Sequence, residues 1–174
     1  MLRYKVILLV AVVALTTTDQ TLLADGTNIL QELRRFPIQN LDGLLVTNSV
    51  LSLDLANSVD GNGSLLIQGA NSVIGLYDVG ALKIQNGTLH CFAHTKTAGS
   101  VDAVRLCLYL EFAGQKDASW NFINWAPSQQ WQRIHLAVTI EKARIPKRIV
   151  VGVEILGKGK VWIDDIRICW EQKN

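Results

Sequence analysis

Residues 132 to 140 read Gln-Arg-Ile-His-Leu-Ala-Val-Thr-Ile, and residues 149 to 155 read Ile-Val-Val-Gly-Val-Glu-Ile. In both stretches every second side chain is apolar, which is the period of a β-strand with one buried face. A helix would instead place its apolar residues three and four positions apart. The second half of the chain is therefore predicted to be extended, with alternate side chains pointing into a core: Ile134, Leu136, Val138 and Ile140, then Ile149, Val151, Val153 and Ile155.

The same period continues on both sides of these stretches, interrupted by turn residues about every ten positions. One segment differs: Asn28 to Phe36 has apolar residues at helical spacing and is closed by Pro37, which indicates a short helix or turn. About eight short strands and no long helix predict an all-β fold, a β-sandwich of two antiparallel sheets. The expected strands are 44–55, 64–67, 81–84, 88–96, 104–112, 132–140, 149–155 and 161–170.

Two of these expected strands, 88–96 and 104–112, flank a turn at Ala98-Gly99-Ser100 and are predicted to pair as a hairpin. In the second strand Leu106, Leu108, Leu110 and Phe112 share one face, so Cys107 lies on the other face. Cys91 lies in the buried set of the first strand, so the two thiols would point to opposite faces and could not form a disulfide. The pairing would bring His90 near Tyr109, Phe92 near Cys107 and His94 near Arg105, a polar and aromatic surface.

The first residues are typical of a secretory signal peptide. Arg3 and Lys5 precede ten uncharged, mostly apolar residues, Val6 to Leu15, and Ala24 offers a small residue for cleavage. Ten residues are too few for a membrane span, which needs about 20. We therefore expect a signal peptide at residues 1–24, a single domain at 25–174, and a secreted, periplasmic or extracellular location.

Composition excludes several classes of function. The chain has 174 residues, 49% of them hydrophobic, and 17 basic against 15 acidic residues, so it lacks the basic excess of nucleic-acid-binding proteins. Its three cysteines form no Cys-x-x-Cys pair. No nucleophile elbow or phosphate-binding loop is present. A carboxylate pair could be proposed from Glu111 and Glu154, but such pairs arise readily by chance, so the sequence does not predict an enzyme.

The final third resembles carbohydrate-binding modules of the galactose-binding-like, jelly-roll type. The residues that carry the resemblance are Trp131-Gln132-Arg133-Ile134, Pro146 to Ile155, and Gly157-Lys158-Gly159-Lys160-Val161-Trp162-Ile163-Asp164-Asp165-Ile166-Arg167-Ile168. In such modules a strand opening on Trp, a strand before a Gly-x-Gly turn and a last strand of this kind occur in that order. The match spans roughly residues 44 to 169, implies a jelly-roll β-sandwich, and assigns Trp131 and Trp162 to the core.

Two adjacent aspartates in an apolar strand need hydrogen bonds or a cation. Alternation groups Asp164 with Trp162, Ile166 and Ile168 on the buried face, and Asp165 with Ile163 and Arg167. The resemblance implies that the inward carboxylate either caps backbone N–H groups or helps to bind a structural Ca2+, so Asp164 and Asp165 are the candidate metal ligands. Where the family usually donates further oxygens, however, this chain has Gln31 to Phe36, with two arginines, which favours capping.

Sugar binding needs flat rings for the apolar face of the sugar and fixed polar groups for its hydroxyls. The predicted surface offers both, together with the aromatic loop expected at 118–125. The alternative interpretation of this surface is an ordinary solvated sheet face. Within the loop, core positions are favoured for at least two of Trp120, Phe122 and Trp125. We expect an exported, non-catalytic carbohydrate- or glycan-binding module. The alternative is a structural or protein-interaction domain of the cell envelope or surface that binds no sugar. The candidate ligand-binding residues are Trp120, Trp125, Tyr109, Arg105, His94 and Glu111.

Overall fold

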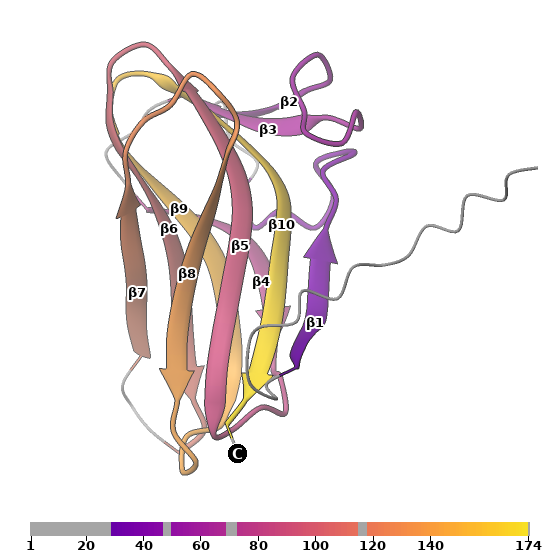
Figure 1. The fold of residues 1–174 in the computed structure, drawn as a ribbon, viewed down its shortest axis with the longest axis vertical. Helices are drawn as coiled ribbons and strands as arrows, with labels where there is room; N and C mark the ends of the chain where they lie inside the picture. The colour runs from indigo at the N-terminus through magenta and orange to yellow at the C-terminus, as the bar shows by residue number, and fades with distance from the viewer. Residues whose placement is uncertain (1–28, 47–49, 69–72, 115–117, 174) are drawn as a thin grey trace, which may run out of the picture.

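The computed structural model describes residues 29–46, 50–68, 73–114 and 118–173. The expected signal peptide lies outside these residues. The described part folds into ten strands and no helix, so it contains no helix long and apolar enough to cross a membrane. The strands form two antiparallel sheets that face each other, as expected for a jelly-roll β-sandwich (Figure 1).

The two sheets contain six and four strands. Sheet A has the order β2-β3-β10-β5-β8, and β1 pairs with β10 beyond the end of β3. Its strands are β1 (Leu30–Phe36), β2 (Leu51–Asp54), β3 (Ser64–Gln68), β5 (Gly87–Ala98), β8 (Gln132–Ile140) and β10 (Lys160–Gln172). Sheet B has the order β4-β9-β6-β7, with β4 (Val73–Gly80), β6 (Val101–Phe112), β7 (Ala118–Trp125) and β9 (Pro146–Gly157).

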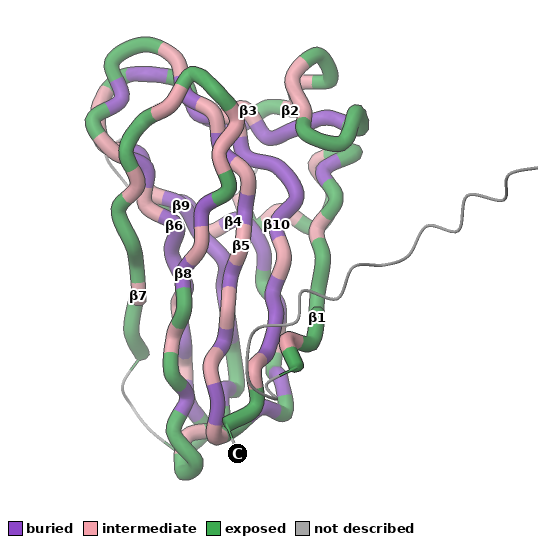
Figure 2. The backbone as a smooth tube through the Cα atoms, in the orientation of Figure 1, coloured by how far each residue is buried: buried purple, intermediate pink, exposed green. Residues whose placement is uncertain are grey.

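The core lies between the sheets and follows the predicted alternation. Ile134, Leu136 and Ile140 of β8 are buried, as are Ile149, Val151, Val153 and Ile155 of β9, while Val138 is half-buried. Figure 2 shows the alternation along the central strands and the exposure of the edge strands β1 and β7. The central strands are thus confirmed by their buried faces.

The predicted hairpin between 88–96 and 104–112 is wrong. The turn after β5 carries the chain from sheet A to sheet B, so β5 pairs with β10 and β8, and β6 pairs with β9 and β7. The three predicted neighbour pairs therefore do not exist in either sheet: His90 does not pair with Tyr109, Phe92 with Cys107, or His94 with Arg105. A turn signal between two alternating stretches is the same whether the chain folds back within a sheet or crosses between sheets, which explains the error.

The segment predicted as a short helix is the edge strand β1. A β-bulge between Glu32 and Arg34 interrupts its alternation, so the apolar residues at three-residue spacing still occur on an extended chain. Leu33 and Phe36 pack against the core, and the Phe36 ring stacks on Tyr77 at 4.4 Å. Pairing with β10 therefore overrides the local helical pattern.

Three other parts of the sequence prediction also differ from the structure. The expected strand at 81–84 is not a strand, and the strand in this region is β4, at residues 73–80. The expected loop at 118–125 is strand β7, and only Leu51–Asp54 of the expected strand at 44–55 forms a strand. Leu44 instead makes an isolated bridge to Tyr77. Most side chains of this edge strand are exposed, so its sequence lacks the alternation of apolar and polar residues that indicates a half-buried strand.

A second β-bulge, in β10 opposite β5, changes which side chains face the core. Before it, Val161 and Ile163 are buried; after it, Ile166 and Ile168 are buried. The assignment of Trp162 to the core alongside Ile166 and Ile168 is therefore wrong. Trp162 is half-buried, and its indole N–H donates to Asp54 Oδ2 at 2.7 Å. Trp131, also assigned to the core, is half-buried just before β8.

The three cysteines are free and buried, one in each of β5, β6 and β10. Cys91 lies in the core and Cys107 on the outer side of sheet B, so the prediction that they cannot pair agrees with the structure. Burial raises the pKa of all three thiols, to about 12 for Cys107 and about 11 for Cys169.

Candidate functional site: the two outer faces of the sandwich

The predicted binding residues are divided between two surfaces. Arg105, Tyr109 and Glu111 of β6 lie on the outer face of sheet B, as does Trp120 of β7. His94 of β5 lies on the outer face of sheet A, on the opposite side of the molecule. Each surface is therefore considered separately.

Aromatic rings occupy the centre of the outer face of sheet B. Tyr109 and Trp120 are directly opposed on β6 and β7, with ring centroids 5.3 Å apart and planes at 53°. Trp120 is 41% exposed. A tilted pair of rings with one indole in solvent presents apolar ring surface of the kind that packs against a sugar.

Gly152 of β9 determines where the Trp120 indole lies. A Cβ at position 152 would lie 3.1 Å from Cζ3 and 3.3 Å from Cη2 of Trp120. Since Gly152 pairs with Cys107 on the far side of β6 from β7, the indole reaches across β6 to contact β9. A glycine within an otherwise apolar strand can indicate such a close approach. Gly152 was therefore a sequence signal for this surface, although it was not among the predicted binding residues.

Polar side chains flank the rings on one side. Arg105 Nη1 lies 2.8 Å from Glu154 Oε2, and its Nε donates to Asn124 Oδ1 at 2.6 Å. The same guanidinium lies 5.0 Å from the centroid of the Phe122 ring. The arginine is thus fixed by three neighbours and supplies oriented N–H groups beside the aromatic pair.

The other side of the rings is a hollow of about 250 Å³, lined by Leu45, Val46, Gly75, Tyr109, Trp120, Arg148 and Val150. Ion pairs stand near its margin: Lys147 with Glu111 at 2.7 Å and Arg148 with Asp78 at 2.8 Å. An apolar hollow with polar groups at its rim is the usual form of a small-molecule site. Glu111 therefore lies at the edge of this surface.

Trp125, also predicted to bind ligand, does not share this face. It pairs with Val104, whose side chain is buried, and packs half-buried against the core. Its indole N–H has no hydrogen-bond partner among the described residues. Core positions were favoured for at least two of three aromatics, but Trp120 and Phe122 are exposed, at 41% and 55%.

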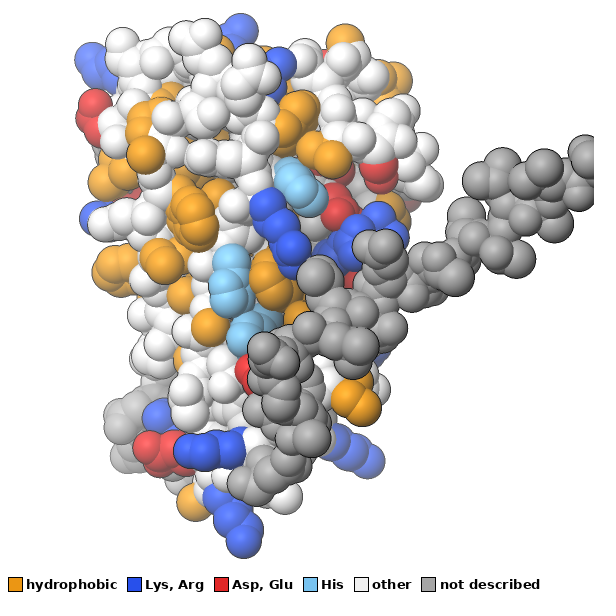
Figure 3. Space-filling view, viewed as in Figure 1, with side chains coloured by type: hydrophobic (Ala, Val, Ile, Leu, Met, Phe, Trp, Pro, Cys, Tyr) orange, Lys and Arg blue, Asp and Glu red, His pale blue; other side chains and the backbone are white. Residues whose placement is uncertain are grey.

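The outer face of sheet A, which faces the viewer in Figure 3, holds the rings of His90, Phe92 and His135, which stack on one another. A hydrogen bond of 2.8 Å joins His90 Nδ1 to His135 Nε2, and His90 Nε2 lies 3.1 Å from Glu171 Oε2. Phe92 stacks on His135 at 4.4 Å, and the Arg133 guanidinium covers Phe92 at 4.2 Å. His135 and Arg133 were not singled out from the sequence, because only the pairing of β5 with β8 places them beside Phe92 and His94.

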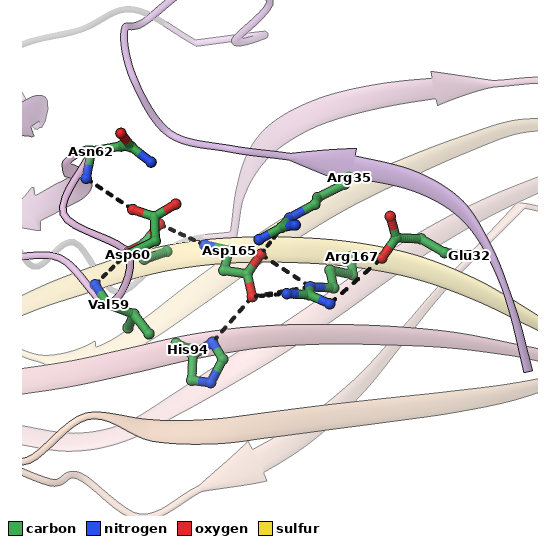
Figure 4. Close-up of polar contacts among 9 residues, drawn as sticks. Glu32, Arg35, Val59, Asp60, Asn62, His94, Asp165 and Arg167 are labelled. Atoms are coloured by element: carbon green, nitrogen blue, oxygen red, sulfur yellow. Dashed lines mark hydrogen bonds and ion pairs between the residues drawn. The ribbon is translucent and has the colours of Figure 1, made fainter. Parts of the chain in front are cut away.

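Both carboxylates of the Asp pair are held by hydrogen bonds. Asp164 Oδ2 accepts from the Val59 N–H at 2.7 Å and Oδ1 from the Asp165 N–H at 2.7 Å. Asp165 receives Arg35 Nε at 2.9 Å and Arg167 through Nε at 3.0 Å and Nη2 at 2.8 Å (Figure 4). The backbone at Asp165 is left-handed, with φ of 47°, which lets both aspartates take these positions at the bulge.

The two aspartates differ in their electrostatics. Burial raises the pKa of Asp164, against the effect of its two backbone hydrogen bonds. Burial would also raise the pKa of Asp165, but the Arg167 and Arg35 guanidinium groups hold it below its ordinary value. Burial lowers the pKa of His94 despite Asp165 at 3.7 Å.

These surroundings do not fit a calcium site. Two guanidinium groups already neutralise Asp165, and the oxygens of Asp164 are occupied by backbone N–H groups. The described residues contain no group of three or more His, Cys, Asp or Glu side chains placed to hold a metal. Arg35 comes from the segment 31–36, where the family was expected to donate oxygens, so a guanidinium lies where calcium ligands were expected.

Comparisons with known proteins agree with this architecture. No protein-family model and no curated protein matches the sequence. Among solved structures, the chain is similar to the CBM22-1 xylan-binding domain of Paenibacillus barcinonensis Xyn10C, with a TM-score of 0.64, 12% identity, and 83% of this chain and 97% of that one covered.

Two further structures give the same result. A family 16 carbohydrate-binding module aligns with a TM-score of 0.58 and 13% identity over 74% of this chain and 91% of that one. The CBM22-1 and GH10 modules of Clostridium thermocellum Xyn10B, complexed with xylohexaose, align at 0.60 and 12% over 79% of this chain and 28% of that one. The chain thus has the β-sandwich fold of carbohydrate-binding modules.

Proposed function

We propose that this chain is an exported, non-catalytic carbohydrate-binding module whose glycan lies across the outer face of sheet B. The observation that carries the proposal is the exposed Trp120 indole beside Tyr109, reaching over β6 to Gly152. The fold shared with carbohydrate-binding modules supports the class of ligand.

The arrangement of groups suits a neutral sugar. The rings can cover the apolar face of a pyranose, while Arg105, Asn124 and Glu154 hold donors and acceptors at fixed positions. Glu111 and Glu154 are each held in an ion pair, with Lys147 and Arg105, which supports a binding role rather than a catalytic one. One or two stacked rings and a few hydrogen bonds predict a Kd in the micromolar to millimolar range, about 4 to 8 kcal/mol.

The test is titration calorimetry of the folded protein with soluble xylan, mixed-linkage β-glucan and galactomannan. Trp120→Ala should weaken binding about tenfold or more, since loss of a stacked ring costs on the order of 1.4 kcal/mol. Trp131→Ala is the matched control, because it removes a half-buried indole next to β8 in the other sheet.

Two outcomes would overturn the proposal. One is a folded wild-type protein that binds none of the three polysaccharides, which would favour a protein-interaction domain. The other is a Trp120→Ala protein that binds as well as Trp131→Ala, which would move the glycan away from sheet B.

A further inference from the structure

A second hollow, of about 190 Å³, lies on the outer face of sheet A. It is lined by Phe92 and His94 of β5, Arg133 of β8, and Asp165 and Arg167 of β10. The hydrophobic, His and Lys/Arg surfaces that meet in the middle of Figure 3 mark this region. Because a liquid water molecule occupies about 30 Å³, the hollow has room for a group the size of one sugar ring.

The charges around this hollow are unequally matched. Asp165, the one acidic residue of the lining, is already bound by Arg35 and Arg167. Arg133, in contrast, has no carboxylate within ion-pair range in the described parts of the chain. Arg167 is paired with Asp165 and also lies 3.7 Å from Glu32, so the guanidinium of the lining that lacks a carboxylate partner is that of Arg133.

Arg133 is also held in place. Its guanidinium lies 4.2 Å from the centroid of Phe92, which in turn stacks on His135 at 4.4 Å. A guanidinium that rests on a ring keeps its N–H edges free for a ligand and loses little freedom when it binds one. The edge of a guanidinium matches a carboxylate through two parallel hydrogen bonds.

We propose that this hollow binds the carboxylate of an acidic sugar residue, with Arg133 as its principal ligand and Phe92 packing beneath. The site is separate from the one proposed on sheet B, since it lies on the other outer face of the sandwich and shares no residue with it. A carboxylate-bearing polysaccharide could therefore bind here whether or not a neutral glycan binds at Trp120.

The experiment titrates the ¹⁵N-labelled full chain with trigalacturonate and, as an uncharged counterpart, with galactotriose. The amide signals of His94, Arg133 and Arg167 should shift with trigalacturonate only, and the affinity should fall severalfold between 20 and 200 mM NaCl. Arg133→Gln should weaken binding at least tenfold, and Arg133→Lys should lose part of it because lysine keeps the charge without the paired donors.

Arg144→Gln is the matched control. Its guanidinium also covers a phenyl ring, Phe112 at 3.9 Å, but it does not line the hollow. This variant and Trp120→Ala should bind trigalacturonate as the wild type does, which separates the result from the fate of the sheet B proposal. Thermal melts verify that each variant is folded.

Three results would overturn the proposal: unchanged binding by folded Arg133→Gln, equal affinity for galactotriose, or displacement of trigalacturonate by millimolar inorganic phosphate. The last would identify a general anion site rather than a site for an acidic sugar.

Discussion

At the scale of single residues, Gly152 shows how an absent side chain can shape a binding surface. A Cβ there would lie 2.9 Å from the Ile74 carbonyl oxygen as well as against the Trp120 indole. Gly152→Ala should therefore displace the indole, weaken glycan binding several-fold, and reduce the free energy of unfolding by about 1 to 3 kcal/mol. Calorimetric titration and urea denaturation measure the two effects.

Gly75→Ala is the comparison for this variant. Gly75 pairs with Gly152 on the neighbouring strand, but a Cβ there would make ordinary contacts, 3.4 Å from Val150 Cγ1 and 3.5 Å from Leu45 Cδ1. Because Gly75 also lines the hollow beside Trp120, the two variants are compared in stability: a Gly152→Ala protein as stable as Gly75→Ala would show that a Cβ at position 152 does not press on the indole.

At the scale of elements, the aspartate pair holds the edge strand β1 and the segment around Val59 against β10. Arg35 supplies the link from β1, so Arg35→Gln should lower the free energy of unfolding by about 1 to 2 kcal/mol. Arg34→Gln is the control, since among the described residues that exposed side chain donates to the carbonyl of Leu33 alone. Equal denaturation midpoints for the two variants would contradict this role of Arg35.

A thermal melt of the wild-type protein tests whether the aspartate pair binds calcium. A cation bound only by the folded chain would raise the melting temperature. Because guanidinium groups already neutralise Asp165, we expect the wild-type melting temperature to be the same with calcium and with chelator. A rise with calcium would restore Asp164 and Asp165 as metal ligands.

Strand content could be predicted from the sequence because alternation is a local property. The buried sets of β8 and β9 were found in this way, as was the strand that follows the turn at Asp60 to Gly63. Pairing partners could not be predicted, because neither the crossing after β5 nor the bulge at Asp164 and Asp165 alters local composition. Because of the bulge, the prediction that Trp162 lies in the core was wrong. Because of the crossing, the prediction that His94 lies near Arg105 was wrong.

At the scale of the whole molecule, the free energy of unfolding should depend on pH through the row of rings on sheet A. Burial, then His90 and Arg133, lower the pKa of His135, and its ring nitrogen is bonded to His90, which in turn faces Glu171. A histidine with a lowered folded pKa has no effect on the free energy of unfolding well above its ordinary pKa of about 6.5, where it is neutral in both states. As the pH falls below that value it destabilises the folded protein, because the unfolded chain binds the proton more tightly.

The melting temperature should therefore decrease from pH 7 to pH 5, and less steeply in His135→Gln. His94, whose pKa is also lowered, keeps part of the dependence in that variant. Identical slopes for wild type and His135→Gln would exclude the His90 and His135 pair as a source of the effect.

The sandwich separates two surfaces of different chemistry, which explains why the candidate site was only partly predictable. Tyr109, Trp120, Arg105 and Glu111 do come together, because β6 and β7 are neighbours in sheet B. His94 joins Arg133 and Arg167 instead, because β5 lies between β8 and β10. One polar and aromatic set in the sequence thus corresponds to two faces in the fold.

The three buried thiols offer a way to follow opening of the molecule from within. Each is buried and none forms a disulfide, so a thiol reagent can reach it only after its surroundings separate. Cys91 lies in the core between the sheets, whereas Cys107 lies on the outer side of sheet B and Cys169 on the last strand. Alkylation rates under native conditions would then show whether the core between the layers opens before or after the outer side of sheet B is uncovered.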